Sequence, residues 1–156
     1  MSGLLARSIV AFLALPGMVA FVVPLWLLAP VPRVFTGRLA SLPLAAGVAL
    51  LLCCVREFYV AGRGTLAPWS PPSHLVISGP YRFSRNPMYI AVLLVLCGWA
   101  LGFASATLAA YAAALSAVFH LRVVWFEEPW LARTHGAVWE TYEARVPRWL
   151  GMPARP

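Results

Sequence analysis

The sequence contains neither lysine nor aspartate, and only 11% of its 156 residues are charged. About a quarter of the residues of an ordinary soluble protein are charged, so this composition argues against a soluble domain. Hydrophobic residues make up 62% of the chain instead, and its mean hydropathy is +0.79. The composition therefore indicates an integral membrane protein.

The chain also lacks the patterns that indicate a metal site or a nucleic-acid-binding face. Its cysteines, Cys53, Cys54 and Cys97, lie in apolar stretches without a C-x-x-C spacing, so we interpret them as small hydrophobic residues and predict no metal site. The charged residues, twelve arginines and five glutamates, give a net charge of +7. Nucleic acid requires a solvated basic face, whereas these arginines flank apolar segments. We therefore expect membrane lipids, and no nucleic acid, as partners; the pattern leaves the oligomeric state open.

Long uncharged runs predict four membrane-spanning helices. Residues 9–29 form the first; a signal peptide is the alternative, but the run is interrupted by Pro16, Gly17 and Pro24 and has no A-x-A cleavage site. Residues 39–55 form the second, which we expect to continue to about Val60. Residues 87–121 are too long for one crossing, so we predict a tight hairpin with its hinge at residues 102–105, whose alanine-rich second arm packs closely.

The distribution of arginine predicts the orientation of these helices. Four spans place both termini on one side, and by the positive-inside rule that side is the cytoplasm, since it holds most of the arginines: Arg7, Arg63, Arg82, Arg85, Arg133, Arg145, Arg148 and Arg155, against Arg33 and Arg38 opposite. The compact chain and the absence of a targeting signal favour a bacterial inner membrane.

The tail of the chain, residues 129–148, mixes apolar and charged residues and predicts an amphipathic helix on the membrane surface, broken at Gly136. The predicted fold is therefore all-α and integral to the membrane, with about four spans and this interfacial helix. Residues 1–60 supply the first two spans, and residues 61–156 supply a cytosolic loop, the hairpin and the tail, in one compact domain.

Three polar groups stand at the cytoplasmic ends of the predicted spans. The first, which we call the threshold, is residues 78–90, with Tyr81, Arg82, Arg85, Asn86, Pro87 and Tyr89. The second is Glu127 with Glu128, and the third includes Tyr142, Arg145, Pro147 and Arg148. Each has a structural interpretation, because Asn and Pro cap and open helices and arginines orient spans. Taken together, however, a helix start with adjacent arginines can also bind an anion. The two glutamates would then bind the positive group of a zwitterionic ligand.

These residues resemble a known superfamily. GPYRFSRNPMY, followed by EEPWLARTHGAVWETYEARVPR, is similar to the isoprenylcysteine carboxyl methyltransferase and phospholipid methyltransferase superfamily, over about residues 61–149. Each motif is weak alone, but the ordered set is specific. This chain departs from the pattern in having Asn86 where many members have histidine, so that a ring-nitrogen contact is replaced by an amide.

The resemblance implies a methyltransferase that binds S-adenosylmethionine without a Rossmann domain and takes a lipophilic acceptor from the bilayer. Glu127 or Glu128 would then hold the ammonium group or ribose diol of the cofactor, and Arg85 its carboxylate, with Arg82 as an interchangeable alternative. Tyr81 and Tyr89, or Trp125, would face its adenine or sulfonium. Asn86, Pro87 and Tyr142 complete the implied cofactor site.

The acceptor is left open. A carboxylate acceptor of the isoprenylcysteine type needs no base, and Arg145 or Arg148 would orient it. A phospholipid amine must lose a proton, for which His120, Glu127 or Glu128 is the candidate. Two other functions compete: a sterol-type NADPH-dependent reductase, whose threshold is related but whose ending differs, and a non-enzymatic membrane scaffold.

Overall fold

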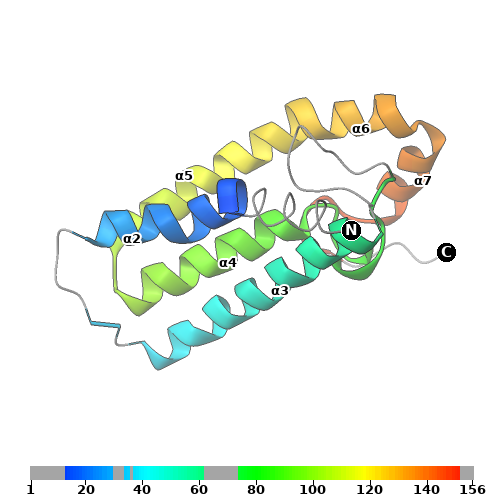
Figure 1. The fold of residues 1–156 in the computed structure, drawn as a ribbon. Helices are drawn as coiled ribbons and strands as arrows, with labels where there is room; N and C mark the ends of the chain where they lie inside the picture. The colour runs from blue at the N-terminus through cyan, green and yellow to red at the C-terminus, as the bar shows by residue number, and fades with distance from the viewer. Residues whose placement is uncertain (1–12, 30–33, 36, 62–73, 152–156) are drawn as a thin grey trace.

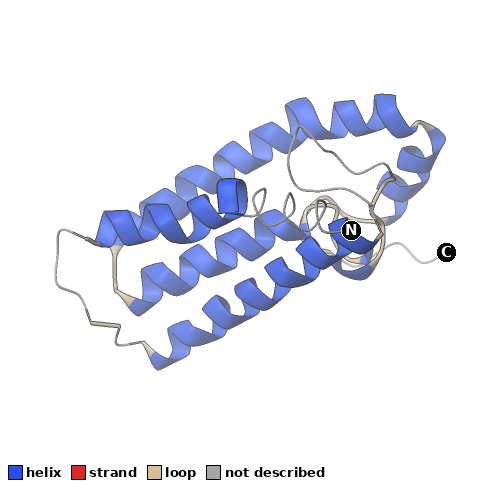
Figure 2. Ribbon diagram, viewed as in Figure 1, coloured by secondary structure: helices blue, strands red, loops and turns tan. Residues whose placement is uncertain are grey.

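The computed structural model describes residues 13–29, 34–35, 37–61 and 74–151, and within them the protein is all-helical without a strand, as predicted (Figure 2). The elements are η1 (Leu13–Val22), α2 (Val23–Leu28), η2 (Arg38–Ala40), α3 (Ser41–Val60), η3 (Gly79–Arg82), α4 (Pro87–Gly102), α5 (Ala106–Arg122), η4 (Val123–Glu127), α6 (Glu128–His135) and α7 (Ala137–Arg145). The beginning of the first predicted span, most of the loop after α3, and Arg7, Arg33, Arg63 and Arg155 lie outside the described residues.

The apolar helices form an antiparallel bundle with α4 between α3 and α5 (Figure 1). Helix α4 packs closely on α3 because glycines stand at the contact: a Cβ on Gly47 would lie 2.7 Å from the Val95 nitrogen, and one on Gly98 would lie 2.8 Å from the Leu44 Cα. We expected close packing by the alanine-rich second arm of the hairpin, which is α5. The structure shows this packing between α3 and α4 instead, and most alanines of α5 are exposed.

Four apolar helices occupy the predicted positions. Two, Arg38–Val60 and Ala106–His135, are long and apolar enough to cross a membrane, and Pro16–Leu28 and Pro87–Gly102 are shorter. The predicted hinge is confirmed, because α4 ends at Gly102 and α5 begins at Ala106. Ser105 stabilises the new helix, since its Oγ accepts a hydrogen bond from the Leu108 N–H.

The structure differs from the prediction in where the last span ends and the tail begins. Helix α5 continues through the π-helical turn η4 into α6, so that Ala106–His135 is one long helix and Pro129 does not end it. The predicted break at Gly136 is confirmed: this residue has φ +51°, and α7 turns back there toward the start of α4 (Figure 1).

The described arginines separate as predicted. Arg38 stands near the α4–α5 hinge, where neighbouring Gly37 approaches Gly102, and the other end of the bundle carries Arg82, Arg85, Arg133, Arg145 and Arg148. Which end faces the cytoplasm stays a prediction.

A proline in the first helix explains how this helix is attached to the hairpin. Pro24 has no N–H, so the carbonyls of Ala20 and Val19, its partners in α- and π-helical hydrogen bonding, lose a donor. Trp99 Nε1 donates to the Ala20 carbonyl at 3.1 Å, and the Tyr111 hydroxyl donates to the Val19 carbonyl at 3.3 Å. Side chains of α4 and α5 thus replace the donor that proline removes, and they hold the first helix in place.

We predict that Trp99→Phe lowers the free energy of unfolding by about 1–3 kcal/mol, because it leaves the Ala20 carbonyl in an apolar interior without a donor. Adding Pro24→Ala supplies a backbone N–H and should recover part of this loss. Thermal unfolding of the single and double variants in detergent measures the coupling. Trp26→Phe, at an exposed tryptophan, is the control, and strictly additive effects of Trp99→Phe and Pro24→Ala would contradict the prediction.

Candidate functional site

The threshold begins with a turn that is fixed to α3. Gly79 has φ +56°, and a Cβ there would lie 2.8 Å from the Glu57 Cγ. The Ser78 hydroxyl donates a hydrogen bond to Glu57 Oε2, and Arg56 Nη1 donates to Oε1 at 2.9 Å. A carboxylate of α3 therefore sets the direction in which the chain enters the threshold.

The side chain of Tyr81, in the threshold, is buried rather than exposed. Its ring is buried with Cys54 and packs edge-on against Phe58. Its carbonyl accepts a hydrogen bond of 2.8 Å from the Tyr142 hydroxyl of α7. Burial raises the pKa of the Tyr142 phenol well above its usual range, so the hydroxyl stays protonated and this link between α7 and the threshold persists at neutral pH.

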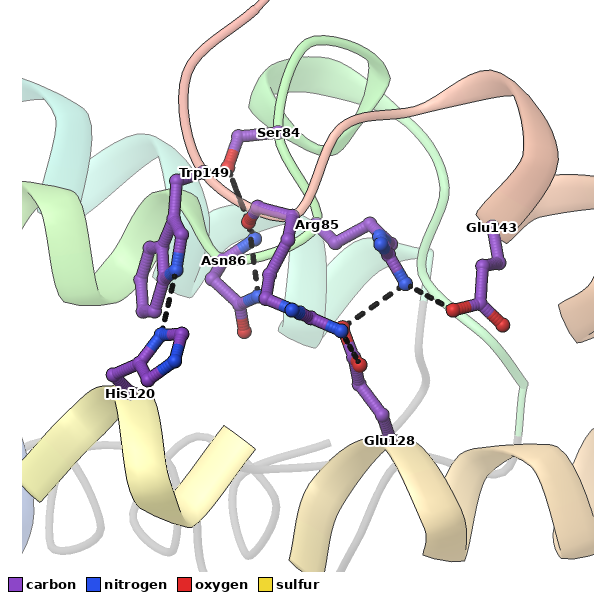
Figure 3. A network of polar contacts seen from close by, with 8 residues as sticks. Ser84, Arg85, Asn86, His120, Glu128, Glu143 and Trp149 are labelled. Atoms are coloured by element: carbon purple, nitrogen blue, oxygen red, sulfur yellow. Dashed lines mark hydrogen bonds and ion pairs between the residues drawn. The ribbon is translucent and has the colours of Figure 1, made fainter. Parts of the chain in front are cut away.

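Four charged side chains, Arg85, Glu128, Glu143 and Arg148, form what we call the charge cluster (Figure 3). Arg148 holds Glu128 by two parallel hydrogen bonds, from Nε to Oε1 at 2.8 Å and from Nη2 to Oε2 at 2.7 Å. Arg85 Nη1 lies 2.9 Å from both Glu128 Oε1 and Glu143 Oε1. The hydrogen bonds to Glu128 raise the pKa of Arg148. Two arginines and two glutamates leave the cluster without net charge, and both oxygens of Glu128 are occupied.

Arg85 is the most enclosed member of the charge cluster. Its side chain is only 9% exposed, and its guanidinium lies 5.5 Å from the centre of the Trp139 ring. Its Nε–H is buried without an acceptor among the described residues. A buried donor without a partner is costly, and it is therefore a candidate contact for a ligand.

The backbone of the tail is bound to the threshold next to this cluster. The Arg85 N–H donates to the Pro147 carbonyl at 2.9 Å. The Arg148 carbonyl accepts from Asn86 Nδ2 at 3.0 Å and from the Ser84 hydroxyl at 3.3 Å. Asn86 thus occupies the N-cap position of α4, as predicted, but its side chain binds the tail, and α4 begins without a side-chain cap.

A second group, which we call the aromatic cluster, consists of Tyr89, Phe119, His120, Glu127 and Trp149. Tyr89 stacks on Phe119 with ring centres 4.4 Å apart, and Trp149 lies 6.4 Å from Tyr89. Trp149 Nε1 donates to His120 Nδ1 at 3.2 Å (Figure 3). Glu127 Oε1 accepts from the Tyr89 hydroxyl and, at 2.7 Å, from Arg122 Nε, while its Oε2 has no donor in the described part of the chain.

Three predicted site residues are exposed and belong to neither cluster. Arg82 and Arg145 are exposed and form no ion pair with the described residues, and Trp125 is exposed on the outer surface. Of the interchangeable pair Arg82 and Arg85, only Arg85 meets the glutamates. Pro87 is buried at the first position of α4, where no N–H is needed.

Sequence reasoning missed Glu57, Ser84, Phe119, Glu143 and Trp149. Two of these had a signal: Glu57 ends an apolar run, where a carboxylate needs a partner, and Trp149 directly follows the V-P-R ending. Among the residues that the structure describes, no group of three or more His, Cys, Asp or Glu side chains could hold a metal ion.

Comparison with known proteins gives one match. The profile of the family described as phospholipid methyltransferase matches residues 39–138, nearly two thirds of the chain, including the threshold, the hairpin and both adjacent glutamates. The searches of curated proteins and of solved structures gave no match.

The geometry at Gly79 predicts a large effect of a single methyl group. Gly79→Ala should lower the free energy of unfolding by about 1–3 kcal/mol, because it strains a left-handed backbone position and meets the Glu57 side chain. Glu57→Ala removes the atoms that the new Cβ meets. The double variant should therefore lose at least about 0.5 kcal/mol less than the sum of the single losses, measured by thermal unfolding. Additive losses would contradict the contact.

Removing one charge from the charge cluster should be costly. Glu128→Gln leaves Arg85 and Arg148 competing for one carboxylate, and we expect a loss of about 3–5 kcal/mol in the free energy of unfolding, as for other broken buried pairs. Glu140→Gln on α7 is the matched control, because Glu140 is exposed and forms no ion pair within the described chain; its effect should stay within about 0.5 kcal/mol. Equal unfolding midpoints for the two variants would show that the cluster does not hold the tail.

Proposed function

The chain belongs to the phospholipid methyltransferase family, and on that premise we propose that it is a membrane enzyme that transfers the methyl group of S-adenosylmethionine to a lipophilic acceptor. Membership implies methyl transfer by a membrane protein. The methyl donor, the acceptor and the residues that hold them are the proposal.

One observation carries the choice of methyl donor: a buried N–H without an acceptor and side-chain oxygens without a donor among the described residues stand near the start of α4. The donors are the buried Arg85 Nε–H and the first N–H groups of the uncapped α4. The acceptors are Glu127 Oε2 and the Asn86 side-chain carbonyl, which has no donor among the described residues and points away from the tail (Figure 3). This pattern matches a ligand that carries both a carboxylate and an ammonium group.

The proposed contacts follow from this division. Arg85 and the start of α4 would hold the carboxylate of S-adenosylmethionine, and Glu127 with Asn86 would hold its ammonium group. Its sulfonium supplies an electrophilic methyl group when it is bound. Glu128 and Arg148 have their charges paired with each other, so we assign them to positioning the tail rather than to binding the ligand.

The partners of each charged group also limit which residues could contact the methyl acceptor. Arg145 is exposed and unpaired within the described chain, so a carboxylate acceptor would meet Arg145 rather than Arg148. For an amine acceptor, Glu128 is fully paired and His120 Nδ1 already accepts from Trp149. Of these three groups only Glu127 has an oxygen left for a proton, and the proposed contacts already use that oxygen for the ammonium group of the methyl donor. Membership of the family weighs against the reductase and the scaffold.

Calorimetry with S-adenosylmethionine tests the proposal on the purified protein in detergent or nanodiscs. The wild type should bind saturably, and Glu127→Gln should weaken binding about 10- to 100-fold, because a hydrogen bond to a charged group is lost. Arg85→Lys, which keeps the charge but removes the fork, should have a comparable effect.

The chain offers a matched control for each variant. Glu140→Gln and Arg82→Lys make the same chemical changes at exposed, unpaired positions and should leave the affinity unchanged. A folded wild type that does not bind S-adenosylmethionine would refute the proposal, and saturable binding of NADPH in its place would restore the reductase.

A further inference from the structure

Trp149 has no part in the proposed contacts, yet the structure brings it into the site. It lies beyond the region matched by the family profile, on the segment after α7. The backbone hydrogen bonds of Pro147 and Arg148 to the threshold carry it to the end of the bundle where Tyr89 and His120 stand. Figure 3 shows Trp149 and His120 on one side of Asn86, with Arg85 and Glu128 on the other.

No aromatic ring stacks flat on the indole of Trp149 in the described part of the chain. Its N–H edge is used by the hydrogen bond to His120. Its plane is tilted 55° from Tyr89 and 31° from His120, so neither ring stacks flat against it, and the side chain is half-buried. Tyr89 and Phe119, in contrast, cover each other at 4.4 Å. Within the described part of the chain, the guanidinium of Arg85 lies over the ring of Trp139, and no guanidinium lies over Trp149.

A carboxylate stands beside this ring system, and its negative charge can attract a neighbouring cation without a hydrogen bond. The Tyr89 hydroxyl fixes Glu127 through Oε1 and leaves Oε2 without a donor among the described residues. The Glu127 side chain is 30% exposed. Its cation partner, Arg122, has a side chain that is 61% exposed, and such surface pairs are weak and screened. An indole face next to a fixed carboxylate is the combination that proteins use to recognise cations that cannot donate hydrogen bonds.

We infer that Trp149, with Tyr89 and Glu127, forms a recognition site for an onium cation that has no N–H group, a sulfonium or a fully alkylated ammonium centre, which hydrogen bonds cannot recognise. The inference rests on the proposed function and extends it to specificity. Transfer of the methyl group turns the sulfonium into a neutral thioether, so the attraction to the indole face is lost in the product. Trp149 thereby makes the site prefer the charged methyl donor to S-adenosylhomocysteine and favours release of the product.

The test compares the affinities of S-adenosylmethionine and S-adenosylhomocysteine by calorimetry on the full chain. Trp149→Leu should weaken binding of S-adenosylmethionine about 3- to 10-fold and binding of S-adenosylhomocysteine less than about twofold. Trp149→Phe, which keeps an aromatic face, should lie between the wild type and Trp149→Leu. Trp26→Leu, at an exposed tryptophan of the first helix that belongs to neither cluster, should change neither affinity.

A second measurement avoids any question of folding. Replacing Trp149 by tryptophan carrying one to four fluorine atoms keeps the ring shape and the N–H but weakens the negative face stepwise. The logarithm of the affinity for S-adenosylmethionine should fall with each fluorine, whereas that for S-adenosylhomocysteine should stay level. Equal losses for both ligands, in this series or in Trp149→Leu, would overturn the inference and leave Trp149 as a wall of the site.

Tetramethylammonium distinguishes the two sources of an onium cation. If it displaces S-adenosylmethionine from the wild type and not from Trp149→Leu, the sulfonium occupies this site. If it binds the wild type in a Trp149-dependent way together with S-adenosylmethionine, the site takes the ammonium group that methylation of an amine acceptor produces. A wild type that binds neither S-adenosylmethionine nor S-adenosylhomocysteine would refute the proposed function, and Trp149-independent or absent binding of tetramethylammonium would then refute the onium site as well.

Discussion

The clasp of Arg148 and Arg85 on Glu128 is the contact on which the polar end of this protein depends. It joins three segments that are far apart in the sequence: the threshold before α4, the start of α6 and the segment after α7. A buried ion pair adds little net stability compared with apolar packing, but it fixes geometry, because each charge is costly in any other arrangement. With Arg148 fixed, its carbonyl reaches Ser84 and Asn86, and the next residue, Trp149, reaches His120.

Pairing divides the polar residues into those that hold this end of the protein together and those that the proposed ligand would contact. Glu128, Arg148, Tyr142 and Glu57 have their groups occupied by neighbours, so their contacts build the frame. Arg85 Nε and Glu127 Oε2 have no partners among the described residues, although both side chains are otherwise held in place. A group that is rigid through some of its atoms and unsatisfied through others is preorganised for a ligand, since little conformational freedom remains to be lost on binding.

Sequence reasoning located the features that local chemistry decides. The hinge after Gly102, the break at Gly136 and the start of α4 at Asn86 and Pro87 follow from residues whose backbone preferences act within one turn. It could not choose between Arg82 and Arg85, because which of them faces Glu128 depends on the short turn η3 and on contacts with α7. For the same reason it missed the continuity of α5 into α6, where a π-helical turn accommodates Pro129, and the use of Asn86 as a partner of the tail.

The arrangement around Glu127 also constrains the reaction proposed for this site. One free carboxylate oxygen cannot both hold the ammonium group of a donor and remove a proton from an acceptor. His120 cannot take the second task while Trp149 occupies Nδ1, because the neutral imidazole then carries its proton on the other nitrogen. Methylation of a carboxylate requires no proton removal and is compatible with the structure as it stands. For methylation of an amine, His120 could serve as the base only if Trp149 released its Nδ1, so under the proposed function this route would depend on the position of the tail, which the Glu128 clasp holds.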